Sequence, residues 1–199
     1  MREPIFNLPP VTAAVAGLLV LVHGLRQFLD RREDLWLDFT FGVVPARYDL
    51  ALDWPALIAP FSHSLLHAGW LHLAINVATL AAFGSGVERM VGGARMLVVF
   101  VLTAALAAGV HILVYAGDLV PVVGASGAIS GLFGVVIVLL HWRGQLGGSL
   151  KLVAVVWIAV AVVTGLIGVP GQEDLSIAWV VHIAGFGAGL ALAPMIARR

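Results

Sequence analysis

The chain alternates long stretches without charge and short charged segments, and this alternation predicts its elements. Six uncharged windows of 22, 34, 22, 24, 21 and 23 residues follow one another along the sequence. A helix needs about 20 apolar residues to cross the hydrocarbon core of a bilayer, so each window is long enough for one span. We therefore expect an all-α, polytopic, six-span membrane protein in which residues 1–199 form a single domain. The windows are 4–25, 54–87, 96–117, 119–142, 152–172 and 175–197.

The second window is longer than one span requires. Pro55 and Pro60 disfavour continuous helix in its first part, so we place its span after a polar approach. The predicted spans are approximately 8–27, 64–86, 96–116, 125–142, 152–169 and 177–196.

Composition excludes several classes of protein. The chain is 61% hydrophobic and 11% charged, with a mean hydropathy of +1.04, which excludes a soluble globular domain and a disordered chain. The net charge is zero, so nucleic acid is not an expected partner. Without cysteine there is no thiol nucleophile and no thiolate metal site, and we expect no metal and no cofactor.

The basic residues indicate the orientation in the membrane. Alternate loops and the termini hold most of them, whereas the other loops hold four arginines against nine acids. By the positive-inside rule, both termini are expected in the cytoplasm. The long outer segment 26–53 mixes charge with apolar groups, so part of it is expected in the interface or packed on the helices. The cytoplasmic set is Arg2, Arg89, Arg95, Arg143, Lys151, Arg198 and Arg199.

Polar side chains inside the windows are the functional candidates, because they are costly in hydrocarbon unless paired. His72 and Asn76 are four residues apart and share one helix face, where two donors suit a developing oxyanion. Alternatively they anchor loop backbone. His63 and His67 share the same spacing and suggest a metal pair, but no window offers an Asp or Glu ligand, so metal is not favoured.

Ser126 follows a second pattern, Gly124-Ala125-Ser126-Gly127, at the expected start of a helix. Neighbouring glycines permit a tight turn, and a helix N-terminus offers free N–H groups to an oxyanion. The site therefore suits a nucleophile. The structural alternative is that the serine only caps the helix.

His182 lies within the last window and needs a polar partner there. Small residues recur on one face of its helix and on one face of the helix after Ser126, which favours close approach of the two helices. If these faces meet, His182 reaches Ser126; alternatively the glycines serve packing alone. Topology places Ser126, His182 and His72 in one leaflet. The small residues are Gly127, Gly131 and Gly134, and Ala178, Gly185 and Gly189.

These motifs together resemble the rhomboid intramembrane serine proteases. The resemblance covers nearly the whole chain: six windows, a long first outer loop, and three motifs in the family's order. The motifs are H-x4-H-x3-N at His67, His72 and Asn76, GxSG at Gly124 to Gly127, and H-x2-G-x3-G at His182, Gly185 and Gly189.

The resemblance implies a serine endopeptidase with a Ser–His dyad. Ser126 would be the nucleophile and His182 the general base, while His72, Asn76 and the Ser126 N–H would form the oxyanion hole. Ser130 stands where many members carry an aromatic residue beside the histidine. The residues expected to support the site are His67, Gly124, Gly127, Ser130 and Gly185.

The resemblance also implies partners and a location. The expected substrates are single-span membrane proteins cut near small residues, and the expected location is a bacterial inner membrane. Residues 168–176 would act as a mobile lid. Two alternatives stay open: an inert rhomboid-like protein that binds membrane clients, and a small transporter or channel. The sequence carries no signal for an oligomeric state.

Overall fold

The fold is known from a computed structural model that describes residues 7–50, 52–167 and 179–197. In these ranges the regular secondary structure is helical, apart from one isolated antiparallel bridge between Val43 and Val122. The predicted all-α class is confirmed. The helices are α1 (Pro10–Arg26), α2 (Arg31–Phe41), α3 (Arg47–Leu50), α4 (Trp54–Ser62), the 3-10 turn η1 (His63–Leu65), α5 (Trp70–Val91), α6 (Gly93–Val114), α7 (Ser126–Trp142), α8 (Leu150–Ile167) and α9 (Trp179–Ala197).

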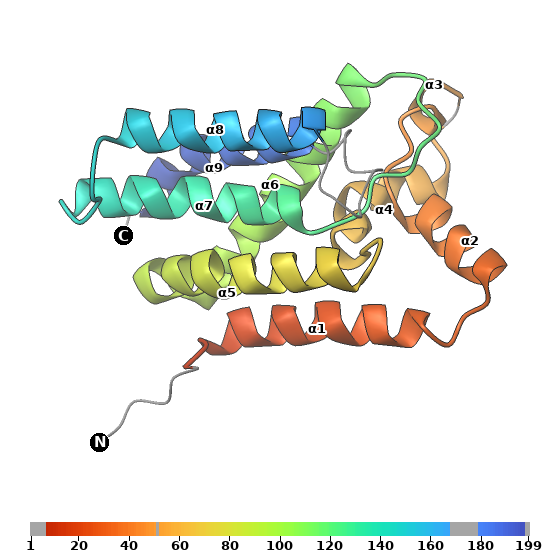
Figure 1. The fold of residues 1–199 in the computed structure, drawn as a ribbon, viewed down its shortest axis with the longest axis horizontal. Coiled ribbons are helices and arrows are strands. Elements are labelled where there is room, and N and C mark those ends of the chain that lie inside the picture. The colour runs from red at the N-terminus through yellow and green to blue at the C-terminus, as the bar shows by residue number, and fades with distance from the viewer. Residues whose placement is uncertain (1–6, 51, 168–178, 198–199) are drawn as a thin grey trace.

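The long helices form a bundle in two rows. Figure 1 shows α1, α5, α7 and α8 in front, with α6 and α9 behind them. The short helices α2, α3 and α4 gather beyond one end of this bundle, which we call the α2 end. Helices α5, α7 and α9 all begin at the α2 end, so the predicted site residues near their starts share one side of the molecule.

Among the described residues, three helices are long and apolar enough to cross a bilayer: Trp70–Val91, Gly93–Val114 and Trp179–Ala197. Three shorter apolar segments, Pro10–Arg26, Ser126–Trp142 and Leu150–Val163, lie in the windows where the other spans are predicted. At 1.5 Å per residue a helix of 17 residues covers about 26 Å, slightly less than a typical hydrocarbon core. Within the described residues, a helix overlaps each of the six predicted segments.

The approach to the second span differs from the prediction. Pro55 and Pro60 were expected to prevent continuous helix, but α4 includes both of them. Pro55 lies in the first turn, where its missing N–H has no helical partner to lose, and the Asp53 carboxylate accepts the Ala56 N–H at 3.0 Å. The predicted span 64–86 begins instead at Trp70, because the chain turns through η1, and it continues to Val91.

The segment between α1 and α4 packs on the bundle through part of its length. Val43 and Val44 are buried, and Val43 exchanges backbone hydrogen bonds with Val122 at 2.8 and 3.0 Å. This bridge joins the segment to the loop that precedes α7. The side chains of Trp36 and Phe39 on α2 remain exposed, so the expectation of packing is confirmed for one part of the segment.

A buried carboxylate joins α1 to α5 at the opposite end of the bundle. Glu88 accepts hydrogen bonds from the Val11 N–H at 3.0 Å, the Thr12 N–H at 2.7 Å and the Thr12 hydroxyl at 2.7 Å. These donors include free N–H groups of the first turn of α1. Four residues after Glu88, Gly92 caps the end of α5, and its φ of 90° suits glycine and lets α6 start at once.

Candidate active site

Ser126 is the first residue of α7, and the loop before it is held by backbone contacts. Gly124 has a φ of 127°, which favours glycine, and its N–H donates to the His63 carbonyl at 2.9 Å. Ala125, not Ser126, occupies the N-cap position, and no side chain caps the helix. The capping role considered as an alternative for Ser126 therefore does not apply. Ser126 is half-buried and belongs to the first turn, whose N–H groups have no partner within the helix.

The glycine faces of α7 and α9 meet, as the sequence predicts. A Cβ on Gly185 would collide with the Gly127 carbonyl, and one on Gly189 would collide with the Gly131 carbonyl. The two backbones therefore touch without side chains between them. These helices have the most extensive contact of any pair among the described elements.

This interface brings the neighbours of the two predicted catalytic residues together. Val181 Cγ1 lies 2.6 Å from the position that a Cβ on Gly127 would take. Gly127 follows Ser126 and Val181 precedes His182, so the backbones that carry the serine and the histidine run side by side. His182 is half-buried.

His72 faces the loop before Ser126 from the start of α5. Its Cε1 and Nε2 lie 2.7 and 2.9 Å from where a Cβ on Gly124 would be, so only glycine leaves room for the ring. Asn76 is buried one turn further along, and its Nδ2 donates to the His72 carbonyl at 2.9 Å.

The supporting histidines extend from this group. The His67 ring is buried and makes an edge contact with the His72 ring, at 5.1 Å between centroids. His63 instead points back to α4, with Nδ1 donating to the Ala59 carbonyl at 3.0 Å. Within the described ranges, no group of three His, Cys, Asp or Glu side chains is arranged to hold a metal ion.

Ser130 and the predicted lid are the remaining features that the sequence predicts for this site. Ser130 is 2% exposed, one turn after Ser126 on α7, so it lies inside the bundle. The predicted lid, 168–176, and Ala178 lie outside the described residues.

Sequence reasoning missed one polar contact next to this site. Arg26, the last residue of α1, is buried and donates to the carbonyl of His67 at 3.2 Å. It also contacts Asp34 and Asp38 on α2. The sequence did carry a signal for the ion pairs, because two acids four residues apart share a helix face and can bind one cation. It carried none for the carbonyl, because which carbonyl the arginine reaches depends on the fold.

Comparison with known proteins agrees with this geometry. The family model described as "Rhomboid domain" matches residues 56–199, which hold Ser126, His182, His72 and Asn76. The chain belongs to the rhomboid family. A rhomboid domain is a polytopic helical membrane fold, and the protein is therefore an integral membrane protein.

Individual rhomboid relatives share moderate identity with the chain. YdcA, a rhomboid protein of Bacillus subtilis, is 39% identical over 124 residues, which cover 58% of this chain and 55% of YdcA. "Rhomboid-type serine protease 2" of Emericella nidulans is 31% identical over 152 residues, covering 73% of the chain and 27% of that protein. "Rhomboid protease GlpG" of Klebsiella pneumoniae is 28% identical over 188 residues, covering 94% and 63%. The chain thus spans less than two thirds of the length of each.

Proposed function

We propose that the protein is an intramembrane serine endopeptidase that hydrolyses peptide bonds in or near the transmembrane segments of membrane proteins. The observation that carries this proposal is the contact of Gly127 with Val181, which brings the backbones beside Ser126 and His182 together in a rhomboid chain. The names of two relatives, a serine protease and a rhomboid protease, support the same reaction class.

In the proposed reaction, His182 takes the proton of the Ser126 hydroxyl as the oxygen attacks the carbonyl carbon of a peptide bond. The tetrahedral intermediate then collapses, and the imidazolium delivers its proton to the leaving amine. Water enters next and loses a proton to His182 as its oxygen attacks the acyl carbon. His182 then returns this proton to the Ser126 oxygen as the ester bond breaks, which releases the carboxylic acid and regenerates Ser126. Because the six uncharged windows contain no acid, packing and neutral hydrogen bonds must orient the imidazole.

The developing oxyanion needs donors at the same end of the bundle. The Ser126 N–H has no carbonyl partner one turn earlier, because Ser126 begins α7. His72 lies against Gly124, two residues from Ser126, and Asn76 follows it by one turn. One N–H of the Asn76 amide bonds the His72 carbonyl, which leaves its second N–H for the oxyanion.

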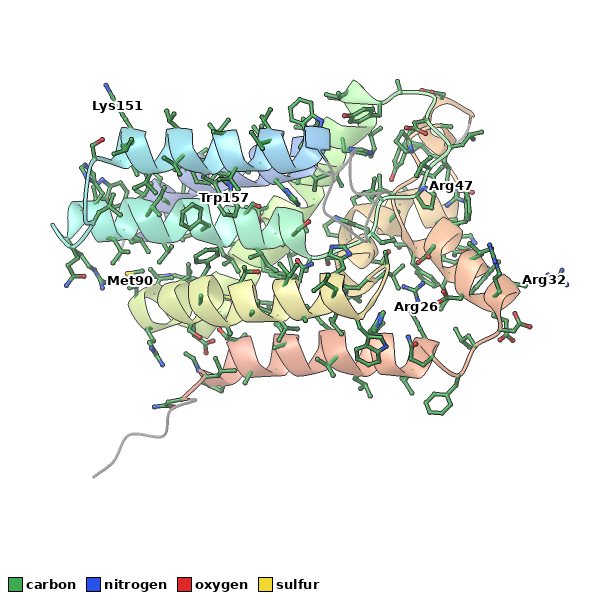
Figure 2. All side chains as sticks on the ribbon, viewed as in Figure 1. Arg26, Arg32, Arg47, Met90, Lys151 and Trp157 are labelled. Carbon is green, nitrogen blue, oxygen red and sulfur yellow. The ribbon has the colours of Figure 1, made fainter. Side chains whose placement is uncertain are left out.

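The proposal includes six spans, both termini in the cytoplasm and a bacterial inner membrane as the location. The orientation rests on charge: Arg143 and Lys151 flank the turn between α7 and α8, and Figure 2 shows Lys151 at the end of the bundle opposite α2. The chain has no cysteine, so single cysteines report topology cleanly. In intact cells an impermeant maleimide should label Arg32→Cys but not Arg143→Cys, and the reverse pattern would contradict this orientation.

Fluorophosphonate labelling of the detergent-purified protein tests the chemistry. The wild type should be labelled, whereas Ser126→Ala should abolish labelling and His182→Ala should lower its rate by about 10³-fold or more. Ser85→Ala is the matched control, because Ser85 is also buried but lies toward the opposite end of α5, and it should label normally.

Cleavage of a single-span substrate in vesicles should follow the same order of variants. A folded wild type that remains unlabelled would contradict the proposed dyad and favour a protein that binds membrane clients without cutting them.

A further inference from the structure

A buried arginine links the α2 end of the bundle to the proposed site. Arg26 has a side chain that is only 5% exposed. A guanidinium withdrawn from water is costly unless each donor group finds a partner. Figure 2 shows Arg26 between the end of α1 and α2.

Every nitrogen of this guanidinium has a different partner. Nε donates to Asp34 Oδ1 at 2.6 Å, Nη2 donates to Asp38 Oδ1 at 2.7 Å, and Nη1 donates to the His67 carbonyl at 3.2 Å. Asp34 and Asp38 are one turn apart on α2 and so face the same side. The two carboxylates hold the planar group in one orientation, with Nη1 aimed at His67.

The carbonyl that Arg26 reaches belongs to the segment that enters α5. This segment connects η1 to Trp70, and its cap residue, Gly69, has no side chain to hold the first turn. The His67 ring touches the His72 ring, and the His72 ring lies against Gly124. A shift of the His67 backbone is therefore passed to His72 and to the loop before Ser126.

We propose that Arg26 is a positioning residue for the reaction, which fixes the His67 backbone so that His72 keeps its place against the Gly124 loop. Asp34 and Asp38 act through it by setting the direction of the guanidinium. This inference rests on the proposed function, since the group that it positions is the proposed oxyanion donor.

The electrostatic environment of Asp38 agrees with a mutual dependence between Asp38 and Arg26. Burial raises the pKa of the Asp38 carboxyl, and the adjacent Arg26 guanidinium opposes that rise. Arg26 in turn needs an ionised partner on α2. Removing Asp38 therefore leaves the buried guanidinium with one partner fewer, and removing Arg26 leaves the half-buried Asp38 carboxylate without its cation.

The test measures the kinetics of fluorophosphonate labelling at Ser126, which requires no protein substrate. A purely structural role would lower the amplitude of labelling, because fewer molecules are folded. A positioning role lowers the rate constant of the molecules that do react. Arg26→Met, which keeps the apolar stem, should lower this rate constant about tenfold to a hundredfold. For a membrane substrate, kcat should fall by a similar factor, while KM should stay within about twofold of the wild-type value.

Two variants keep the test decisive if Arg26→Met fails to fold. Arg26→Lys retains the charge without the planar fork, so its rate constant should lie between those of Arg26→Met and the wild type. Asp38→Asn should lower the rate constant in the wild type but add little in an Arg26→Lys background, because the two residues act as one unit. Arg32→Gln is the control on the same short helix, where the exposed side chain should be neutral.

The outcomes separate the two proposals. If the wild type is labelled at Ser126 and the Arg26 variants react with the wild-type rate constant, Arg26 is not a positioning residue, while the proposed function stands. If labelling falls only in amplitude, the role is structural and the inference is again overturned. A folded wild type without any labelling overturns the proposed function itself.

Discussion

Helices α7 and α9 meet through glycines, whereas α8 is attached to the bundle through large aromatic side chains. Between α7 and α9, glycines leave the backbones touching, with Gly185 on Gly127 and Gly189 on Gly131. Between α8 and the bundle, Trp157 packs against Phe133, with the ring centroids 4.6 Å apart, and reaches Phe83 and Phe186 at 6.3 and 6.4 Å. Figure 2 shows Trp157 pointing from α8 toward α7.

The two kinds of contact differ in how much they tolerate movement. Touching backbones allow one separation only, because no side chain can rotate to fill or free space. Aromatic rings can tilt and slide while remaining in contact. The helices that carry Ser126 and His182 thus meet at the interface with the least freedom, whereas α8 is held by groups that can repack.

The largest effect is expected where a methyl group separates the two backbones. In Gly189→Ala the new Cβ would meet the Gly131 carbonyl, with the Gly131 carbonyl carbon 2.7 Å away, so the helices must move apart. We expect the free energy of unfolding to fall by about 3 kcal/mol or more, together with most of the labelling at Ser126. Unfolding in detergent mixtures, followed by far-UV circular dichroism, measures the first quantity.

Gly187→Ala is the matched control on the same helix. Gly187 is exposed, and a Cβ there would have no neighbour within 4 Å, so stability should stay the same or rise slightly. An equal fall in the free energy of unfolding in the two variants would show that α9 needs the backbone flexibility of its glycines, and that the contact with α7 is not the reason.

The sequence predicts this glycine interface because its signal is local. Small residues at helical spacing fall on one face of each helix, and the folded faces meet at Gly127, Gly131, Gly185 and Gly189. The apolar windows likewise predict the long helices, since length and hydrophobicity alone mark a span. The residues alone indicated that Ser126 suits a nucleophile and that His182 could reach it. The proposed catalytic roles were assigned through the resemblance to the rhomboid family.

The parts that the sequence did not predict depend on geometry over longer distances. Helix α4 was missed because proline was interpreted as a helix breaker, although Pro55 lies in the first turn, where it is tolerated. The role of Arg26 was missed because its partner at His67 is a backbone carbonyl 41 residues away. A carbonyl has no residue type, so no motif marks it.

An intermediate effect is expected from removing the main ring that anchors α8. Trp157→Ala deletes its contacts with Phe133, but Trp157 is only partly buried, so lipid can replace some of what is lost. We expect the free energy of unfolding to fall by about 2 kcal/mol, less than for a fully enclosed tryptophan. Labelling of Ser126 in the folded fraction should persist, because α7 and α9 still touch.

Trp142→Ala provides the control for that variant. Trp142 ends α7 and is 53% exposed, so its removal should change stability by less than about 0.5 kcal/mol. Trp157→Ala could instead lower the labelling rate constant as strongly as Gly189→Ala. In that case the proposed difference between the rigid interface of α7 with α9 and the adaptable packing of α8 would be wrong.

The smallest effect tests whether hydrogen bonding adds to the glycine contacts. Thr103 on α6 is fully buried against Gly131, and its hydroxyl lies 3.2 Å from the Ala128 carbonyl on α7 and 2.8 Å from the Val99 carbonyl on its own helix. Thr103→Val keeps the shape and removes the hydroxyl, so stability should fall by about 0.6 kcal/mol, the average for such bonds in membranes.

Thr79→Val is the matched control, because the Thr79 hydroxyl on α5 donates to the carbonyls of Ile75 and Asn76, both on its own helix. That variant should unfold like the wild type. A loss at Thr103 above about 2 kcal/mol would mean that α6 is held to α7 by polar contact, and that close packing of small residues accounts for less of the bundle than the α7 and α9 interface indicates.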